Sequence, residues 1–173
     1  MGYLELTLAI LKPNVAVNPV AIKFVKNLII TSNFKIVRSK RQKCKIKELQ
    51  LFYEEHKDKF FYNRLITFMS SGPSELFILA KENAIQDWRK LLGPTKVYRT
   101  QFEEPNSLRG LFGQSDTRNA FHGSDSKESA EREMSIFFPE FNISDWFVSE
   151  EQFFVNGEIK FQEDKFIHVI QHT

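Results

Sequence analysis

The spacing of apolar residues predicts where the strands lie. Residues 3–11 are rich in leucine, isoleucine and threonine, which predicts a buried strand, and Pro13 ends it because proline cannot donate to a ladder. Phe34 and Ile36 begin a second strand, which runs into a basic stretch. Residues 76–79 are apolar throughout and predict a third, central strand.

Helical spacing fills the intervals between these strands. An apolar stripe from residue 21 to residue 29 predicts a helix with Pro19 in its first turn, and residues 47–56 predict another. Residues 84–92 form a further helix that Gly93-Pro94 ends, and residues 96–107 are expected to be a long loop. By itself this pattern supports an α+β fold and no finer class.

The last part of the chain, residues 140–173, is rich in aromatic side chains interleaved with acidic ones. This much apolar surface indicates that the segment packs on the preceding domain and is not a free linker. We therefore expect a domain of residues 1–139 and a C-terminal extension of residues 140–173. Within the extension, residues 155–161 are expected to form a hairpin with Asn156-Gly157 at its turn.

Composition narrows the class of protein. The 173 residues suffice for one domain with an extension, and the net charge of +2 gives little support for a nucleic-acid or membrane partner. The single cysteine, Cys44, excludes an intrachain disulfide and favours a reducing compartment. No apolar run could span a membrane, and no secretory signal or cleavable leader is evident. An intracellular protein, cytoplasmic or mitochondrial, is expected.

The strongest chemical signal is the sequence N-x-x-H-G-S-D-S at residues 119–126, which contains His122. Asp125 followed by Glu128 predicts a capping box, so His122 is expected on a tight turn just before a helix. The free N–H groups and the dipole of a helix N-terminus attract anions. A histidine at such a place suits a nucleophile that attacks phosphorus.

This motif resembles the active-site motif of the nucleoside diphosphate kinases. The resemblance covers roughly residues 3–139 and implies a ferredoxin-like α/β sandwich, in which helices pack on a four-stranded antiparallel sheet. Leu108-Arg109-Gly110, Phe112-Gly113 and residues 116–119 resemble the divergent group II branch of the family, in particular its type 6 members.

The resemblance also assigns roles to individual residues. His122 would be the catalytic residue, as a pros-phosphohistidine intermediate, with Glu133 orienting it and Ser124 supporting it. Cationic and hydroxyl side chains would bind the phosphates, Phe61 would stack on the base and Asn119 would contact the ribose. The implied nucleotide-binding set is Lys12, Tyr53, Phe61, Leu65, Arg89, Thr95, Arg109 and Asn119.

The implied reaction is a two-step exchange. His122 would take the γ-phosphoryl group from ATP, GTP or another nucleoside triphosphate, and GDP, UDP, CDP or a deoxy form would then take it from the histidine. Mg²⁺ is the expected cofactor, held mainly by the nucleotide phosphates and water without direct protein ligands. The sequence contains no P-loop and no protein-kinase glycine-rich loop, so any phosphate binding must use other residues.

Two other functions stay open. Asn14-Val15 stands where the family usually has Asp-Gly, and the segment after Thr95 is altered, so a weakly active or inactive nucleotide-binding scaffold that acts through a protein partner is an alternative. Assembly varies within the divergent branch, which leaves a homo-oligomer open. The basic run of residues 35–47 is the main support for a nucleic-acid role.

Overall fold

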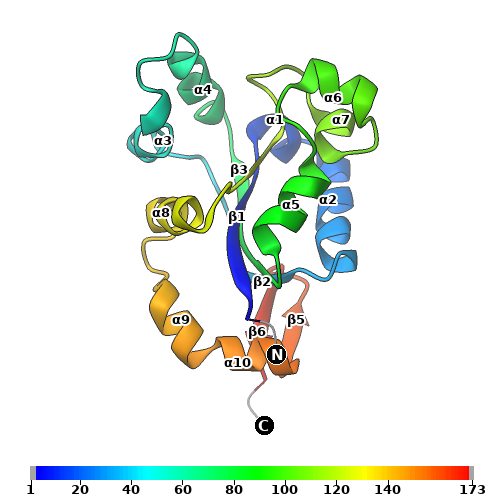
Figure 1. Ribbon diagram of the computed structural model, residues 1–173, viewed down its shortest axis with the longest axis vertical. Coiled ribbons are helices and arrows are strands. Elements are labelled where there is room, and N and C mark those ends of the chain that lie inside the picture. The colour runs from blue at the N-terminus through cyan, green and yellow to red at the C-terminus, as the bar shows by residue number, and fades with distance from the viewer. Residues whose placement is uncertain (1–2, 172–173) are drawn as a thin grey trace.

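Four antiparallel strands form the central sheet of the structure, a computed structural model that describes residues 3–171 (Figure 1). The strands are β1 (Glu5–Leu11), β2 (Lys35–Gln42), β3 (Ser74–Lys81) and β4 (Phe121–Gly123). Their order across the sheet is β2-β3-β1-β4, and each neighbouring pair is antiparallel. The predicted α+β class and the ferredoxin-like sandwich are therefore confirmed.

The sheet separates two apolar cores, because successive residues of a strand point to opposite faces. In β1, Leu8 and Ile10 belong to one core, and Ala9 and Leu11 belong to the other. All four side chains are fully buried. Strand β1, which lies between β3 and β4, is thus apolar on both faces, and this explains the unbroken apolar run of residues 8–11 in the sequence.

The helices divide between these two cores. The core of Leu8 lies under α3 (Ile46–Phe52), α4 (Tyr62–Met69) and α8 (Lys127–Phe137). The core of Ala9 lies under α2 (Pro19–Thr31), α5 (Ala84–Leu92) and α7 (Leu108–Phe112). Shorter elements are α1 (Pro13–Ala16), the 3₁₀ turn η1 (Glu54–His56) and α6 (Val97–Glu103). Within residues 3–171, no helix combines the length and the apolar character needed to cross a bilayer.

Three local predictions are wrong. Helix α8 takes Ser126 and not Asp125 as its N-cap, since the Ser126 hydroxyl accepts the Ser129 N–H at 3.1 Å. The helix expected over residues 47–56 ends at Phe52, and η1 follows as a separate turn. The expected loop of residues 96–107 contains α6, whose Val97 and Thr100 are buried, so one face of this short helix packs on the domain.

The C-terminal extension wraps around one end of the sheet (Figure 1). It contains α9 (Ile143–Ser149), α10 (Glu151–Asn156), β5 (Ile159–Gln162) and β6 (Ile167–Ile170). Trp146 and Phe154 are buried in the core of Leu8, whereas Phe166 is buried in the core of Ala9. The extension therefore contributes apolar side chains to both sides of the sheet.

The hairpin in the extension differs from its prediction. Asn156 ends α10, and Gly157 caps that helix with φ of 76°, a left-handed conformation that glycine adopts freely. The strands of the hairpin are β5 and β6, so its turn lies at residues 163–166. Strand β6 lies beside the edge strand β2, where the Ile36 N–H donates to Nδ1 of His168 at 2.9 Å. The hairpin thus covers part of an edge that could pair with another chain.

Candidate functional site

His122 lies in the middle of β4, where it pairs with Ile10 of β1. Its Nε2 contacts Oε2 of Glu133 on α8 at 2.5 Å, and the Ser124 hydroxyl donates to the same oxygen at 3.0 Å. Ser124 in turn accepts the Leu8 N–H at 3.1 Å. These contacts fix the imidazole ring between the sheet and α8, with Nδ1 as the nitrogen that Glu133 does not hold.

The tight turn expected for His122 is wrong. The residue belongs to a strand, and α8 begins only at Lys127, so the ring is not at the helix N-terminus. The link between His122 and α8 is instead the side chain of Glu133, which is buried in the middle of the helix.

Two residues that sequence reasoning missed also position His122. The ring of Phe52 packs edge-on against the imidazole, with 4.8 Å between ring centroids. The indole N–H of Trp88 donates to the His122 carbonyl at 3.0 Å, and the indole comes so close that a Cβ at Gly123 would lie 2.7 Å from it. Phe52 stands next to Tyr53 and Trp88 next to Arg89 in the sequence, but neither neighbourhood indicates a contact with His122.

The backbone just before β4 is strained. Ala120 is fully buried and has φ of 76°, a conformation that L-residues other than glycine rarely adopt. Its carbonyl accepts the Lys12 N–H at 2.8 Å. The strained residue therefore lies where a backbone hydrogen bond joins the end of β1 to the start of β4, two residues before His122.

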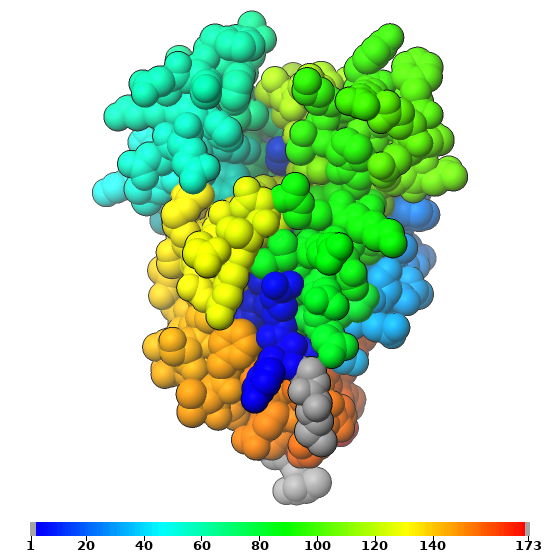
Figure 2. Space-filling view, viewed as in Figure 1, coloured from blue at the N-terminus to red at the C-terminus, as the bar shows by residue number. Residues whose placement is uncertain are grey.

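A cavity of about 280 Å³ opens in front of His122, between α3 and η1 on one side and α5 and α7 on the other. Figure 2 shows the molecule hollowed between these two regions. The predicted site residues that line the cavity are Lys12, Tyr53, Arg89, Thr95, Arg109, Asn119, His122 and Glu133. His56, Asp125 and Arg132 line it too, and sequence reasoning missed them.

Three predicted site residues do not line this cavity. Ser124 is fully buried behind Glu133, where it supports the carboxylate. Leu65 is part of the core under α4. Phe61, half-buried at the start of α4, packs against His56 with 5.4 Å between ring centroids. It therefore lies beside a lining residue and not on the cavity wall itself.

Lys12 and Arg109 are buried cations that pair with no carboxylate among residues 3–171. The Lys12 ammonium donates to Oδ1 of Asn119 at 2.8 Å, and burial, with the neighbouring Arg109 charge, lowers the pKa of Lys12 to about 7. Arg109 donates to the carbonyls of Gly93 and Phe121 at 2.6 and 3.0 Å, while its Nε has no partner. Burial and the Arg89 charge lower the pKa of Arg109 to about 10. Although Glu55, Asp125 and Glu133 also line the cavity, none of them pairs with these two cations, which an anionic ligand would do.

Tyr53 adds a further unsatisfied donor. Its side chain is buried, and its hydroxyl has no hydrogen-bond partner in the part of the chain that the structure describes. Burial raises the pKa of the phenol, so it remains a neutral O–H donor. The Tyr53 hydroxyl and the Arg109 Nε are thus two buried hydrogen-bond donors, on residues that line the cavity, to which the described residues offer no acceptor. A ligand rich in oxygen atoms and negative charge would satisfy both.

Comparison with known proteins gives a consistent result. A family model described as "Nucleoside diphosphate kinase" matches residues 5–143. "Nucleoside diphosphate kinase 6" of Danio rerio is 46% identical over 98% of this chain and 97% of the relative, and the human protein of that name is 42% identical over 98% and 91%. A solved structure of the Aquifex aeolicus nucleoside diphosphate kinase matches with a TM-score of 0.73 and 36% identity, covering 78% of this chain and 95% of that one. The resemblance to this family and to its type 6 members is confirmed.

Proposed function

The chain belongs to the nucleoside diphosphate kinase family, and from this premise we propose that it transfers the γ-phosphoryl group of a nucleoside triphosphate such as ATP to a nucleoside diphosphate. One observation carries the proposal. His122 is held through Nε2 by Glu133 and faces a cavity that Lys12 and Arg109 also line. A nucleophile is thus fixed beside buried cations that have no anion of their own.

The exchange proceeds in two balanced steps. Nδ1 of His122 attacks the γ-phosphorus, the N–P bond forms, and the bond from phosphorus to the β–γ bridging oxygen breaks, so the diphosphate leaves with that electron pair. A terminal oxygen of a second diphosphate then attacks the same phosphorus, and the N–P bond breaks. The histidine returns to its starting state, and its phosphorylated form is the pros isomer, because Glu133 occupies Nε2.

The surrounding residues stabilise charge. Glu133 counters the positive charge that the ring acquires as the N–P bond forms, and Ser124 holds the carboxylate in place. Lys12, Arg89 and Arg109 bind the phosphate oxygens, with Tyr53 and Thr95 as neutral donors. Asn119 would contact the ribose, and Phe61, which lies beside the cavity, would stack on the base, with Leu65 behind it in the core under α4. Stacking on Phe61 would accept GDP, UDP, CDP and their deoxy forms, because every base has a flat face.

Mg²⁺ would reach this site on the nucleotide. Within the described residues, 3–171, no three His, Cys, Asp or Glu side chains are grouped so that they could hold a metal ion. The donors present suit phosphate oxygens and not a cation, so the metal would be held by the phosphates and water. When bound, it would neutralise part of the phosphate charge, and Lys12, Arg89 and Arg109 would neutralise the rest.

The test is single-turnover labelling with γ-³²P-ATP and Mg²⁺, followed by a chase with unlabelled GDP or UDP. We expect acid-labile label on the pros nitrogen of His122, released as triphosphate by either diphosphate. His122→Asn is the matched control, because it is similar in size and can still contact Glu133. Label on the tele nitrogen, or labelling that persists in His122→Asn, would overturn the mechanism.

The same experiment separates the kinase from the scaffold alternative. Asn14-Val15 favours the scaffold, because it stands where the family usually has Asp-Gly; in the structure the Asn14 amide donates to the Phe112 carbonyl at 3.4 Å. A protein that binds ADP tightly yet takes up no label from ATP would be a nucleotide-binding scaffold.

A further inference from the structure

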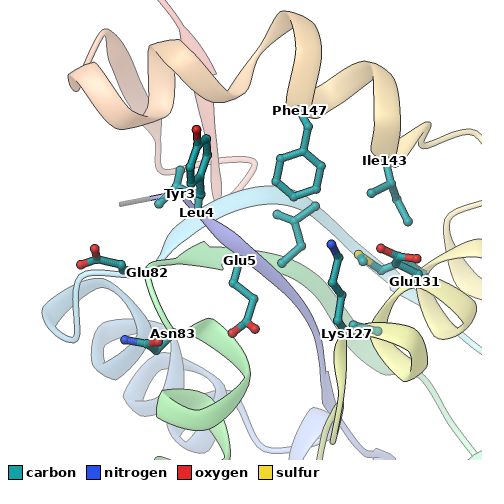
Figure 3. A pocket seen from close by; sticks show the side chains of 12 residues that line it. Tyr3, Leu4, Glu5, Glu82, Asn83, Lys127, Glu131, Ile143 and Phe147 are labelled. Atoms are coloured by element: carbon teal, nitrogen blue, oxygen red, sulfur yellow. The ribbon is translucent and has the colours of Figure 1, made fainter. Parts of the chain in front are cut away.

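A second cavity, of about 460 Å³, lies on the other side of α8 from His122. Its walls are the start of β1, helix α8, helix α9 and the turn between β3 and α5 (Figure 3). Helix α8 separates the two cavities: Glu133 and Ser129 line the first, whereas Ala130 and Met134 line the second. The volume is that of a site for one or two large side chains or a small ligand.

The floor of this cavity is apolar. Leu6, Ala130 and Met134 are buried beneath it. Ile143 and Phe147 are half-buried and reach from α9 towards α8, as Figure 3 shows. A half-buried aromatic ring above a buried apolar floor is the usual setting for an apolar anchor from a partner.

The rim of the cavity is acidic. Among the lining residues that the structure describes, Glu5, Glu82 and Glu131 carry negative charge and Lys127 alone carries positive charge. Glu82 and Glu131 are exposed, and one carboxylate oxygen of Glu5 accepts the Ile85 N–H at 2.8 Å. The excess of negative charge contrasts with the chain as a whole, whose net charge is +2. Phosphate-bearing ligands would be repelled here, whereas lysine or arginine side chains would be attracted.

One wall of the cavity lies outside the part of the chain that matches the family model. Phe147 lies beyond residue 143, where the match to the family model ends. The cavity therefore depends on the C-terminal extension as well as on the domain, and it is separate from the nucleotide site.

We propose that this second cavity is a docking site for a protein segment that presents an apolar side chain flanked by lysine or arginine. The apolar side chain packs on Met134, Ile143 and Phe147, and the flanking cations pair with the acidic rim. The proposal does not rest on kinase activity, because every residue that carries it lies outside the first cavity.

The test is NMR on the full chain with ¹³C-methyl methionine. Met134 lines the cavity, whereas Met69 lies in the core under α4 and serves as an internal control. The probes are acetylated and amidated peptides Lys-Lys-X-Lys-Lys, with X as Leu, Met, Phe or Trp. The same peptides with glutamate in place of lysine, and the lysine peptide with glycine as X, are the controls.

We expect at least one lysine peptide to move the Met134 signal in a saturable way and to leave Met69 unchanged. Glu131→Lys should weaken that binding about tenfold, since it replaces an attraction by a repulsion. Glu128→Lys, an equal charge change on the exposed side of α8 outside the cavity, should leave it within about twofold. Phe147→Ala should weaken it, and Phe153→Ala, on α10, should not.

Three results would overturn the proposal. One is an unmoved Met134 signal with all four lysine peptides at millimolar concentration. Another is equal binding of the glutamate or glycine peptides, which would show that neither charge nor anchor matters. The third is equal weakening by Glu131→Lys and Glu128→Lys.

Discussion

The two cavities on either side of α8 differ in where their charges lie. In the cavity of His122, the charged groups Lys12, Arg109 and Glu133 are buried. In the second cavity, the floor is apolar, and the carboxylates of Glu82 and Glu131 are exposed at the rim. Buried charges interact strongly with a ligand, but their burial destabilises the fold. Exposed charges interact weakly and have little effect on stability.

This difference separates chemistry from recognition. A site that stabilises charge on a transferring phosphoryl group needs donors that are dry and already in place, even at the expense of stability. A docking surface needs apolar area at its centre, and the charges at its rim need only be opposite in sign to those of the partner. The variants below are ordered from the largest expected effect to the smallest, and each tests whether the two sides of α8 differ in this way.

Lys12→Met should stabilise the nucleotide-free protein and weaken nucleotide binding at the same time. The pKa of Lys12 falls from 10.5 to about 7 in the folded protein. A shift of about 3.5 pKa units corresponds to about 5 kcal/mol of destabilisation by the buried charge, less about 1 kcal/mol for the lost hydrogen bond to Asn119. Loss of the ammonium should raise the Kd for ADP about 10- to 100-fold.

The pH dependence of unfolding tests whether the buried charge of Lys12 destabilises the nucleotide-free protein. Between pH 7 and 10.5 the unfolded chain binds more protons at Lys12 than the folded chain does, so the stability of the free wild-type protein should rise with pH across that window. Below pH 7 Lys12 is charged in both the folded and the unfolded chain, so the burial of its charge destabilises the folded protein in full. Denaturant unfolding of wild type and Lys12→Met at pH 6 and pH 9.5 measures it, with Lys23→Met, at an exposed position, as control. Parallel pH profiles for wild type and Lys12→Met would contradict the prediction.

Glu133→Gln should slow phosphorylation of His122 about 10²- to 10³-fold while leaving the fold intact. The amide keeps the shape of the side chain but has no charge to stabilise the ring as the N–P bond forms. Single-turnover labelling gives the rate, and circular dichroism checks the fold. Glu128→Gln, on the exposed side of the same helix, should label at the wild-type rate. A wild-type rate in Glu133→Gln would remove Glu133 from the mechanism.

The sequence predicted the parts of the site that depend on local pattern. The motif around His122 and the end of β1 at Lys12 were recognisable because strand ends and short motifs are local features. Arg89 and Arg109 were implied by the family resemblance alone, and the cavity brings both together with Lys12 and His122. What it missed depends on contacts between distant segments. Nothing near Trp88 in the sequence indicates that its indole binds the carbonyl of His122.

The local errors have the same origin. Asn156-Gly157 suits a hairpin turn, yet the same dipeptide also ends a helix, and packing of Phe154 in the core selects the helix. Asp125 and Ser126 are both good caps, and a one-residue choice between them depends on where the chain leaves β4. Sequence pattern restricts such choices, and tertiary contacts decide between them.

Trp88→Phe should have an intermediate effect on stability. The substitution keeps an aromatic ring but removes the donor to the His122 carbonyl, which should lower the free energy of unfolding by about 1–3 kcal/mol. It should also slow labelling, because β4 is then held less firmly beside α5. Trp146→Phe is the comparison, since that buried indole N–H has no hydrogen-bond partner within the described residues, and its loss removes packing alone. Equal effects of the two substitutions on labelling would show that the bond does not position His122.

Glu131→Lys should have the smallest effect on the isolated protein. The side chain is exposed on α8, so its charge reversal should change the free energy of unfolding by less than about 0.5 kcal/mol. The rate of His122 labelling should stay at the wild-type value, because Glu133, which holds the ring, lies on the other side of the helix. Denaturant unfolding and single-turnover labelling measure the two quantities. A loss of stability as large as that of Trp88→Phe would mean that the acidic rim supports the fold, and the contrast between the two sides of α8 would then fail.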